Sequence, residues 1–235
     1  MKEVNSYGWK AVIGSSIGYA MDGFDLLILG FMLSLISGDL GLTTGQAGSL
    51  VTWTLVGAVI GGFIFGTLSD KFGRVRVLTW TIVLFAVFTG LCAFAQGYWD
   101  LLIYRTIAGI GLGGEFGIGM ALAAEAWPAQ HRAKATSYVA IGWQLGVLAA
   151  ALLTPVLLPY IGWRGMFMVG IIPAFVAWFF RAKLHEPEIF VQSKEIKEHS
   201  HTNSFKLLVK DVRTTKTSIG VAILTSVQNF GYYGI

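Results

Sequence analysis

The chain has 235 residues, of which 54% are hydrophobic and only 13% are charged. A soluble domain carries about 25% charged residues. The composition therefore excludes a globule covered by polar surface and indicates a protein whose solvent is largely lipid. The formal net charge is +4. The basic residues lie in short loops, with no array suited to tracking phosphates, so we expect no nucleic-acid partner.

Six apolar segments are long enough to cross a hydrocarbon core of about 30 Å, which needs roughly 20 helical residues. In chain order they are residues 10–37, 46–68, 77–96, 101–124, 135–160 and 166–181. A seventh apolar segment begins near residue 217, after a polar stretch. We therefore divide the chain into a six-helix transmembrane bundle at 1–182, a cytoplasmic linker at 183–216 and part of a seventh transmembrane helix at 217–235.

Basic residues are distributed unequally between the two sides of the predicted membrane. With the N-terminus inside, the inner side holds the eight basic residues from Arg181 to Lys216, in addition to those of the shorter loops, whereas the outer loops hold only Arg164. Since short cytoplasmic loops carry an excess of Lys and Arg, this asymmetry predicts a cytoplasmic N-terminus.

Glycines recur at a spacing of four residues within the predicted spans. Small residues at this spacing allow helix backbones to approach closely in lipid, so we expect them at helix contacts. The pairs are Gly57/Gly61, Gly62/Gly66, Gly109/Gly113, Gly113/Gly117 and Gly142/Gly146.

Four ionisable residues lie inside predicted spans, where a charge is costly and indicates function by default. Asp22 and Asp25 lie in the first span, and Arg105 and Glu115 lie in the fourth. With a rise of 1.5 Å per residue, Asp25 and Arg105 both lie roughly 22 Å above the inner surface. Glu115 lies roughly 8 Å from that surface. We therefore expect Asp25 to face Arg105 at one depth, across a wet cavity.

Two carboxylates near one guanidinium make a plausible proton-coupled switch. Asp22 and Asp25 are three residues apart and share a helix face. One of them can pair with Arg105, which stays charged, while the other takes up a proton. The alternative is a static ion pair that only locks two helices. Glu115 is a second candidate, although it could simply bond to a neighbouring backbone or loop. Gln144 is a candidate because an amide inside a span needs a polar partner.

The turn between the second and third spans carries a recognisable motif. Gly66 is followed by Asp70-Lys71, then by Gly73-Arg74. This pattern resembles the signature loop between the second and third helices of the major facilitator superfamily. The resemblance implies that Gly66, Asp70, Gly73 and Arg74 form a cytoplasmic gate hinge. We also expect Asp70 to lie beside Arg74, with Arg132 as a further candidate partner, in charge pairs that hold the outward-open state and break on turnover. The alternative is a solvated turn that serves only topology.

Other segments strengthen this resemblance. The stretch from Arg105 to Glu115 is similar to the arginine-glycine motif of the family's fourth helix, and Asp22-Gly23-Phe24-Asp25 resembles the Asp-Gly-x-Asp motif of aromatic acid/proton symporters. Sialic acid transporters carry a similar segment. Further matches are Glu125, Pro128, Arg132, Trp163-Arg164 and Glu186-Pro187-Glu188.

The resemblance implies an all-α membrane protein: the six-helix N-terminal bundle of a twelve-helix fold, with part of a seventh helix. It also implies that Asp22, Asp25 and Arg105 act in coupling or substrate binding. We expect a proton-coupled symporter of a small organic anion in the lipid bilayer of a bacterial inner membrane, with no cofactor and no metal. A C-terminal half, missing here, is expected for activity.

Two alternatives stay open. The chain could be a truncated fragment that does not transport, or a sugar or polyol porter. An enzyme has little support, because the sequence holds no nucleophile–base grouping, no phosphate-binding loop and no metal-ligand cluster.

Overall fold

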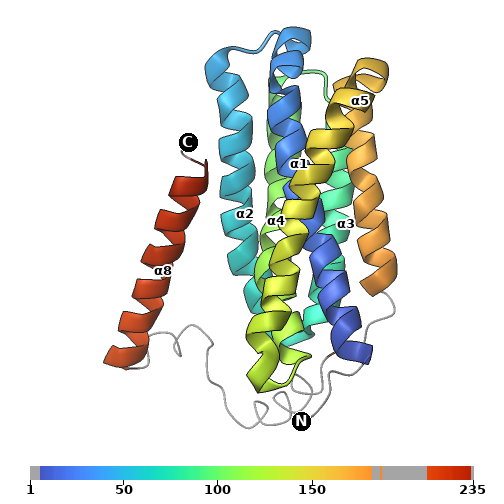
Figure 1. Ribbon diagram of the computed structural model, residues 1–235. Helices are drawn as coiled ribbons and strands as arrows, with labels where there is room; N and C mark the ends of the chain where they lie inside the picture. The colour runs from blue at the N-terminus through green and yellow to red at the C-terminus, as the bar shows by residue number, and fades with distance from the viewer. Residues whose placement is uncertain (1–5, 182–185, 187–210, 234–235) are drawn as a thin grey trace. The chain divides into compact units, whose positions relative to one another are not determined.

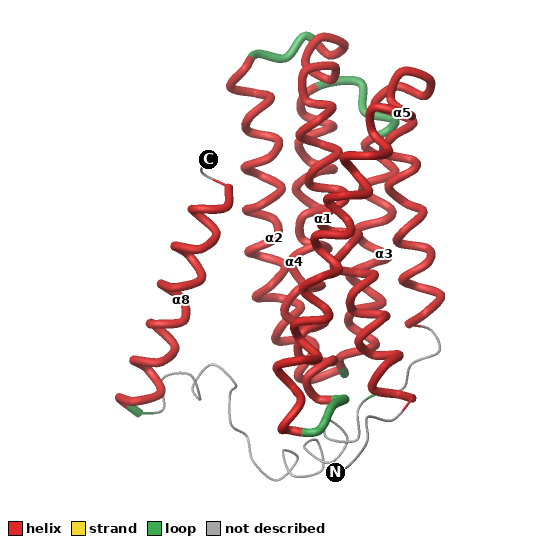
Figure 2. The backbone as a smooth tube through the Cα atoms, in the orientation of Figure 1, coloured by secondary structure: helices red, strands yellow, loops and turns green. Residues whose placement is uncertain are grey.

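The computed structural model describes residues 6–181, 186 and 211–233, and every regular element in these ranges is a helix (Figures 1 and 2). The chain divides into two compact units, Met1–Phe190 and Val191–Ile235. In chain order the elements are α1 (Ser6–Leu40), α2 (Thr44–Phe72), α3 (Arg74–Cys92), α4 (Tyr98–Glu125), the 3-10 turn η1 (Ala129–His131), α5 (Arg132–Arg181) and α8 (Val212–Tyr233).

Helices α1 to α4, and the segment that holds α5, are long and apolar enough to cross a membrane. The fifth and sixth predicted spans are the two arms of α5, which meet at Gly162 with φ 64° and ψ 179°. Figure 1 shows the chain reversing between these arms. A positive φ costs glycine little, because it has no Cβ, so Gly162 suits this reversal. The expected all-helical bundle is confirmed.

The helices of the first unit pack in two close pairs with α3 beside them. Helix α1 lies against α5 and α2 lies against α4, while α3 packs on both α4 and α5. Helix α4 contacts each of the other four long helices. It is therefore the element best placed to bring polar side chains of different helices together.

The expected close approaches at glycine are confirmed at three of the spaced pairs. A Cβ on Gly61 would overlap the carbonyl oxygen of Ile110, and one on Gly113 would overlap that of Ala58. On the other pair of helices, a Cβ on Gly146 would overlap the carbonyl oxygen of Ala20. Glycine is therefore required because one backbone touches another.

Gly66 and Gly117 differ from the other spaced glycines. A Cβ at either position would meet no atom within 4 Å. Their spacing predicted helix contacts, but the structure leaves open space beside both of them.

Helix α8 forms in the second unit, close to where the seventh span was predicted to begin. Asp211 stands just before it and accepts hydrogen bonds from the Thr214 amide (2.8 Å) and hydroxyl (2.9 Å). These bonds lower the pKa of the Asp211 carboxyl and satisfy a donor that the first turn leaves free. Most of the predicted linker lies outside the described residues.

Candidate functional site

The centre of the candidate site is an ion pair between α1 and α4. Arg105 donates from Nη1 to Asp25 Oδ1 (3.0 Å) and from Nη2 to Asp25 Oδ2 (2.7 Å). The guanidinium also lies 5.7 Å from the ring centroid of Phe167. The expectation that Asp25 faces Arg105 is confirmed. This two-pronged geometry is the one that guanidinium and carboxylate groups favour.

The pair is dry, which corrects the expected wet cavity. The side chains of Arg105 and Asp25 are 0% and 1% exposed. Two charges removed from water are stable only in good geometry, because each has lost its hydration. The sequence placed the two residues at one height, but it did not show that the surrounding helices close over them.

Asp22 lies one turn before Asp25 on α1 and is also buried. The glycine between them has a packing role. A Cβ on Gly23 would come within 2.7 Å of the Trp143 carbonyl oxygen on α5. The Asp-Gly-Phe-Asp segment therefore combines two acidic side chains with a surface flat enough to admit the backbone of α5.

Glu115 and Gln144 lie in different surroundings. Glu115 is buried, and its Oε1 lies 2.6 Å from the hydroxyl oxygen of Thr81 on α3. Its polar contact is thus a side chain on a neighbouring helix, which the sequence interpretation did not name. Gln144 is exposed on the first arm of α5.

Aromatic rings from three helices meet one turn before Asp22. Tyr19 on α1 lies 5.0 Å from Phe116 on α4 and 5.1 Å from Trp143 on α5, measured between ring centroids. We call these residues the three-ring cluster. No spacing in the sequence joins these three residues, because they lie on three different helices.

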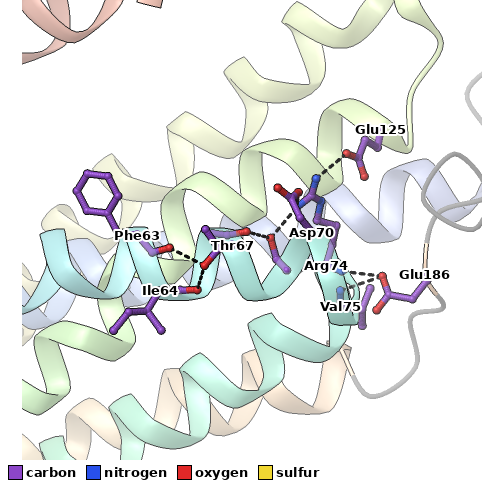
Figure 3. Close-up of polar contacts among 10 residues, drawn as sticks. Phe63, Ile64, Thr67, Asp70, Arg74, Val75, Glu125 and Glu186 are labelled. Carbon is purple, nitrogen blue, oxygen red and sulfur yellow. Dashed lines mark hydrogen bonds and ion pairs between the residues drawn. The ribbon is translucent and has the colours of Figure 1, made fainter. Parts of the chain in front are cut away.

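A second cluster of charges surrounds the turn between α2 and α3 (Figure 3). Arg74 pairs with Asp70 at 2.6 Å and with Glu125 at 3.3 Å. It also donates to the Ser69 hydroxyl at 2.6 Å. One guanidinium therefore links the end of α2, the start of α3 and the end of α4. With Glu186, these charged residues form what we call the gate-loop cluster.

Glu186 closes the amino end of α3. Its carboxylate accepts hydrogen bonds from the backbone amides of Arg74 (2.8 Å), Val75 (3.3 Å) and Arg76 (3.1 Å), as Figure 3 shows in part. The first amides of a helix lack partners within it and favour a negative charge, so this carboxylate stabilises the helix end. The sequence offered Glu186 only as part of a family motif, with no indication of its partner.

Gly73 makes this contact possible. Its φ is 108°, and a Cβ at this position would overlap the Glu186 carboxylate. The motif glycine is thus required both for its backbone conformation and for the space it leaves. Gly66, the other motif glycine, lies within α2.

The opposite end of the bundle holds another ion pair. Arg164 pairs with Asp39 at the end of α1 and also donates to the carbonyl oxygen of Ala95. Trp163 donates to the same Asp39 carboxylate at 3.1 Å. This exposed group joins α1, the loop after α3 and the reversal in α5. Asp39 lies on α1, as Asp25 does. The exposed Asp39–Arg164 pair therefore provides a matched comparison for the buried Asp25–Arg105 pair.

Comparison with known proteins identifies the class. The model of the Major Facilitator Superfamily matches residues 15–235. The chain belongs to this superfamily, a family of membrane transporters and not of enzymes. It is accordingly an integral membrane protein with several spans.

Individual relatives of the chain are transport proteins of bacteria. A "Putative metabolite transport protein" of Haemophilus influenzae is 76% identical over 99% of this chain and 58% of its own length. The sialic acid transporter NanX of Escherichia coli is 33% identical over 82% of this chain and 48% of its own length. The cis,cis-muconate transport protein of Acinetobacter baylyi is 33% identical over 99% of this chain and 57% of its own length. The chain therefore spans about half the length of the curated relatives it matches.

Solved structures show the same fold. The proton:xylose symporter XylE matches with a TM-score of 0.73 over 99% of this chain and 55% of that chain. The sequence identity is 22%, so this likeness concerns the fold alone.

Proposed function

We propose that this chain forms part of a proton-coupled symporter that carries a small organic acid anion across a bacterial inner membrane by alternating access. The observation that carries the proposal is the fully buried, two-pronged Asp25–Arg105 pair. An intramembrane ion pair is costly. A role in which the pair opens and closes gives a reason for retaining it, whereas helix packing alone needs no charges.

The chemistry is an exchange of carboxylates on one guanidinium. When a proton binds Asp25, the carboxylate loses the charge that holds Arg105. The released guanidinium stays positive and offers the same two donors to the carboxylate of a substrate. One proton and one monoanion enter together, so the site's net charge is unchanged. Leaving Arg105 buried without either carboxylate would be costly, so proton and substrate favour each other's binding.

Other polar residues have supporting roles in this proposal. Asp22, one turn from Asp25, receives or passes on the proton. Glu115 and Gln144 are further candidates for proton or substrate contact. The polar partner of Glu115, Thr81, lies on α3, which supports a role in holding α3 and α4 together as the site opens.

The gate-loop cluster is proposed to act as a cytoplasmic latch. With the N-terminus in the cytoplasm, as the distribution of Lys and Arg favours, the α2–α3 turn lies on the inner side. Arg74 then holds three helices in one state, and these contacts loosen when the transporter turns over. Gly66, Asp70, Gly73 and Arg74 together would be the hinge.

The relatives support an organic acid more than a sugar. Two of the relatives described above carry, by their printed names, cis,cis-muconate and sialic acid, which are both carboxylates. The likeness to a xylose symporter concerns the fold and does not favour a sugar substrate. In the family arrangement substrate lies between two halves. Transport therefore calls for a second six-helix half like that of the longer relatives.

The test uses the complete transporter that contains this chain, reconstituted in vesicles with no gradient. Benzoate, cis,cis-muconate, N-acetylneuraminate and xylose are added in turn while the external pH is recorded. The proposal expects the medium to become more alkaline with at least one of the acids and not with xylose. Alkalinisation by xylose alone, or by none of the four, would contradict it.

A further inference from the structure

An apolar groove runs between α3 and the second arm of α5. Its volume is about 470 Å³, within the range of pockets that hold a small molecule. The lining residues are glycine, alanine and larger apolar side chains, and Val87 and Phe175 among them are exposed. A Cβ on Gly90 would come within 2.8 Å of Ile171 Cδ1, so the two helices touch at this point of the groove.

The groove covers the depth of one leaflet of a bilayer. On α5 its lining residues run from Met168 to Trp178, which is ten residues or about 15 Å of helix. This length is half of a hydrocarbon core of about 30 Å. Trp178 lies three residues before Arg181, where α5 ends. With the N-terminus in the cytoplasm, as the distribution of Lys and Arg favours, this end of α5 lies at the inner surface. The groove is therefore at the depth of the inner leaflet.

Two exposed basic residues stand towards the inner end of the groove. Arg76 precedes Val83, a lining residue of α3, by seven residues or two helical turns, so the two lie on the same face of the helix. Lys71 lies 5.5 Å from the ring centroid of Phe72. The Phe72 ring in turn lies 5.7 Å from the ring of Trp80, one turn after Arg76. The apolar groove thus continues into a positively charged end.

The carboxylates nearest to this charged end are engaged elsewhere. In the gate-loop cluster two of them pair with Arg74, and Glu186 accepts hydrogen bonds from the first amides of α3. The ion pairs formed among the described residues do not include Lys71 or Arg76. Both positive charges are therefore available to an anion that approaches from the membrane.

We propose that the groove binds an anionic phospholipid of the inner leaflet, with an acyl chain between α3 and α5 and the headgroup phosphate at Arg76 and Lys71. Guanidinium groups bind phosphate through two donors, and basic pockets between membrane helices on the cytoplasmic side suit anionic headgroups. The exposed rings of Trp80 and Trp178 suit the interface between headgroups and acyl chains. A helix of another protein would fill the groove equally well, but it would leave the two positive charges uncompensated. The bound lipid holds α3 against the second arm of α5, whichever substrate is carried.

The experiment measures lipid binding to the complete transporter in detergent by native mass spectrometry. Dioleoylphosphatidylglycerol and dioleoylphosphatidylcholine are added at equal concentrations, because they share their acyl chains and differ in the charge of the headgroup. The unsubstituted protein is expected to retain phosphatidylglycerol in preference. Arg76→Gln and Lys71→Gln should each weaken this binding about fivefold, the effect of one basic residue near an anionic headgroup.

The matched control is Lys134→Gln. Lys134 is exposed near the start of the first arm of α5, which does not line the groove, so its loss should leave the preference unchanged. A further variant, Ala86→Phe, fills the groove without changing any charge and should also weaken retention of phosphatidylglycerol. Folding of every variant is checked by its melting temperature in detergent.

Three results would overturn the lipid site. The first is equal retention of the two lipids by the unsubstituted protein, and the second is an unchanged preference in Arg76→Gln or an equal fall in Lys134→Gln. The third is a dimer that Ala86→Phe dissociates while lipid retention stays the same, which would assign the groove to a second copy of the protein. Because binding is measured without substrate, none of these results bears on the proposed function.

Discussion

Because glycine has no side chain, Gly73 meets two requirements of the structure, one of backbone conformation and one of space. The residue has a φ of 108°, and the space that a Cβ would occupy is filled by the Glu186 carboxylate. Glu186 in turn bonds the first three amides of α3. Gly73, which the motif assigns to a gate hinge, therefore also leaves the space for the carboxylate that caps α3.

Replacing Gly73 by Ala should destabilise the protein by about 1–3 kcal/mol through backbone strain, and it should also displace the cap. The check is the melting temperature of the purified protein in detergent. Gly66→Ala is the control from the same motif, since a Cβ there meets open space within α2. The control should be neutral or slightly stabilising, because alanine favours helix more than glycine. Equal melting temperatures for the two variants would contradict this account.

The residues of the buried pair could be predicted from the sequence, but their environment could not. The pairing followed from a constant, the rise per helical residue, together with the bilayer thickness. The burial of Arg105 depends on how α1, α4 and the second arm of α5, with Phe167, pack around it. The partner of Glu186 was equally hidden, because residues 74–76 are more than a hundred positions away in the chain.

At the scale of helices, close backbone contact is the main organising feature. The packing of α1 on α5 and of α2 on α4 depends on glycines that face carbonyl groups of the partner helix. Apolar side chains cannot drive this association in lipid, where the tails are equally apolar, so close packing has to supply the attraction.

Gly146→Ala should therefore force α5 away from α1 and lower stability by about 1–3 kcal/mol, the usual cost of overpacking. The measurement is again thermal unfolding in detergent. Gly30→Ala on α1 is the control, because a Cβ there would meet no atom within 4 Å. A Gly146→Ala variant as stable as this control would show that the helices tolerate separation.

The gate-loop cluster gives a second test at this scale. Asp70→Lys places a positive charge beside Arg74, whose guanidinium now lies 2.6 Å from the Asp70 carboxylate. The state in which Arg74 holds the three helices should lose stability. Turnover should slow, as measured by the rate of substrate exchange in vesicles. Exchanging the two residues, Asp70→Arg with Arg74→Asp, should restore part of the rate by restoring opposite charges. Normal turnover in Asp70→Lys would leave the turn with a role in topology only.

The helices themselves were largely predictable, because hydrophobic length in lipid leaves few alternatives. Most boundaries moved outward by a few residues, whereas α3 ends at Cys92, before the predicted end at 96. The first span was predicted at 10–37, whereas α1 extends over Ser6–Leu40. Polar ends of helices carry no hydrophobic signal, so a hydropathy pattern misses them. The reversal at Gly162 was read as a loop between two spans, which describes its effect correctly.

At the scale of the whole molecule, the proposed orientation makes a direct prediction. Tyr160, near the reversal in α5, should lie outside, and Lys71, in the α2–α3 turn, should lie inside. Both side chains are exposed. In a complete transporter without other cysteines, Cys92→Ala included, a membrane-impermeant maleimide should label Tyr160→Cys on intact cells but label Lys71→Cys only after permeabilisation. The reverse pattern would place the N-terminus outside.

The central claim is that a proton binding to Asp25 frees Arg105 to bind the carboxylate of the substrate. Under an imposed inward gradient of one pH unit, a 1:1 symport of a proton with a monoanion should accumulate the anion about tenfold. In the complete transporter, Asp25→Asn should abolish this accumulation. Asp39→Asn, the same change on the same helix in the exposed pair with Arg164, should retain it, once both variants are shown to be folded in the membrane. Accumulation by Asp25→Asn equal to that of the unsubstituted protein would contradict the account.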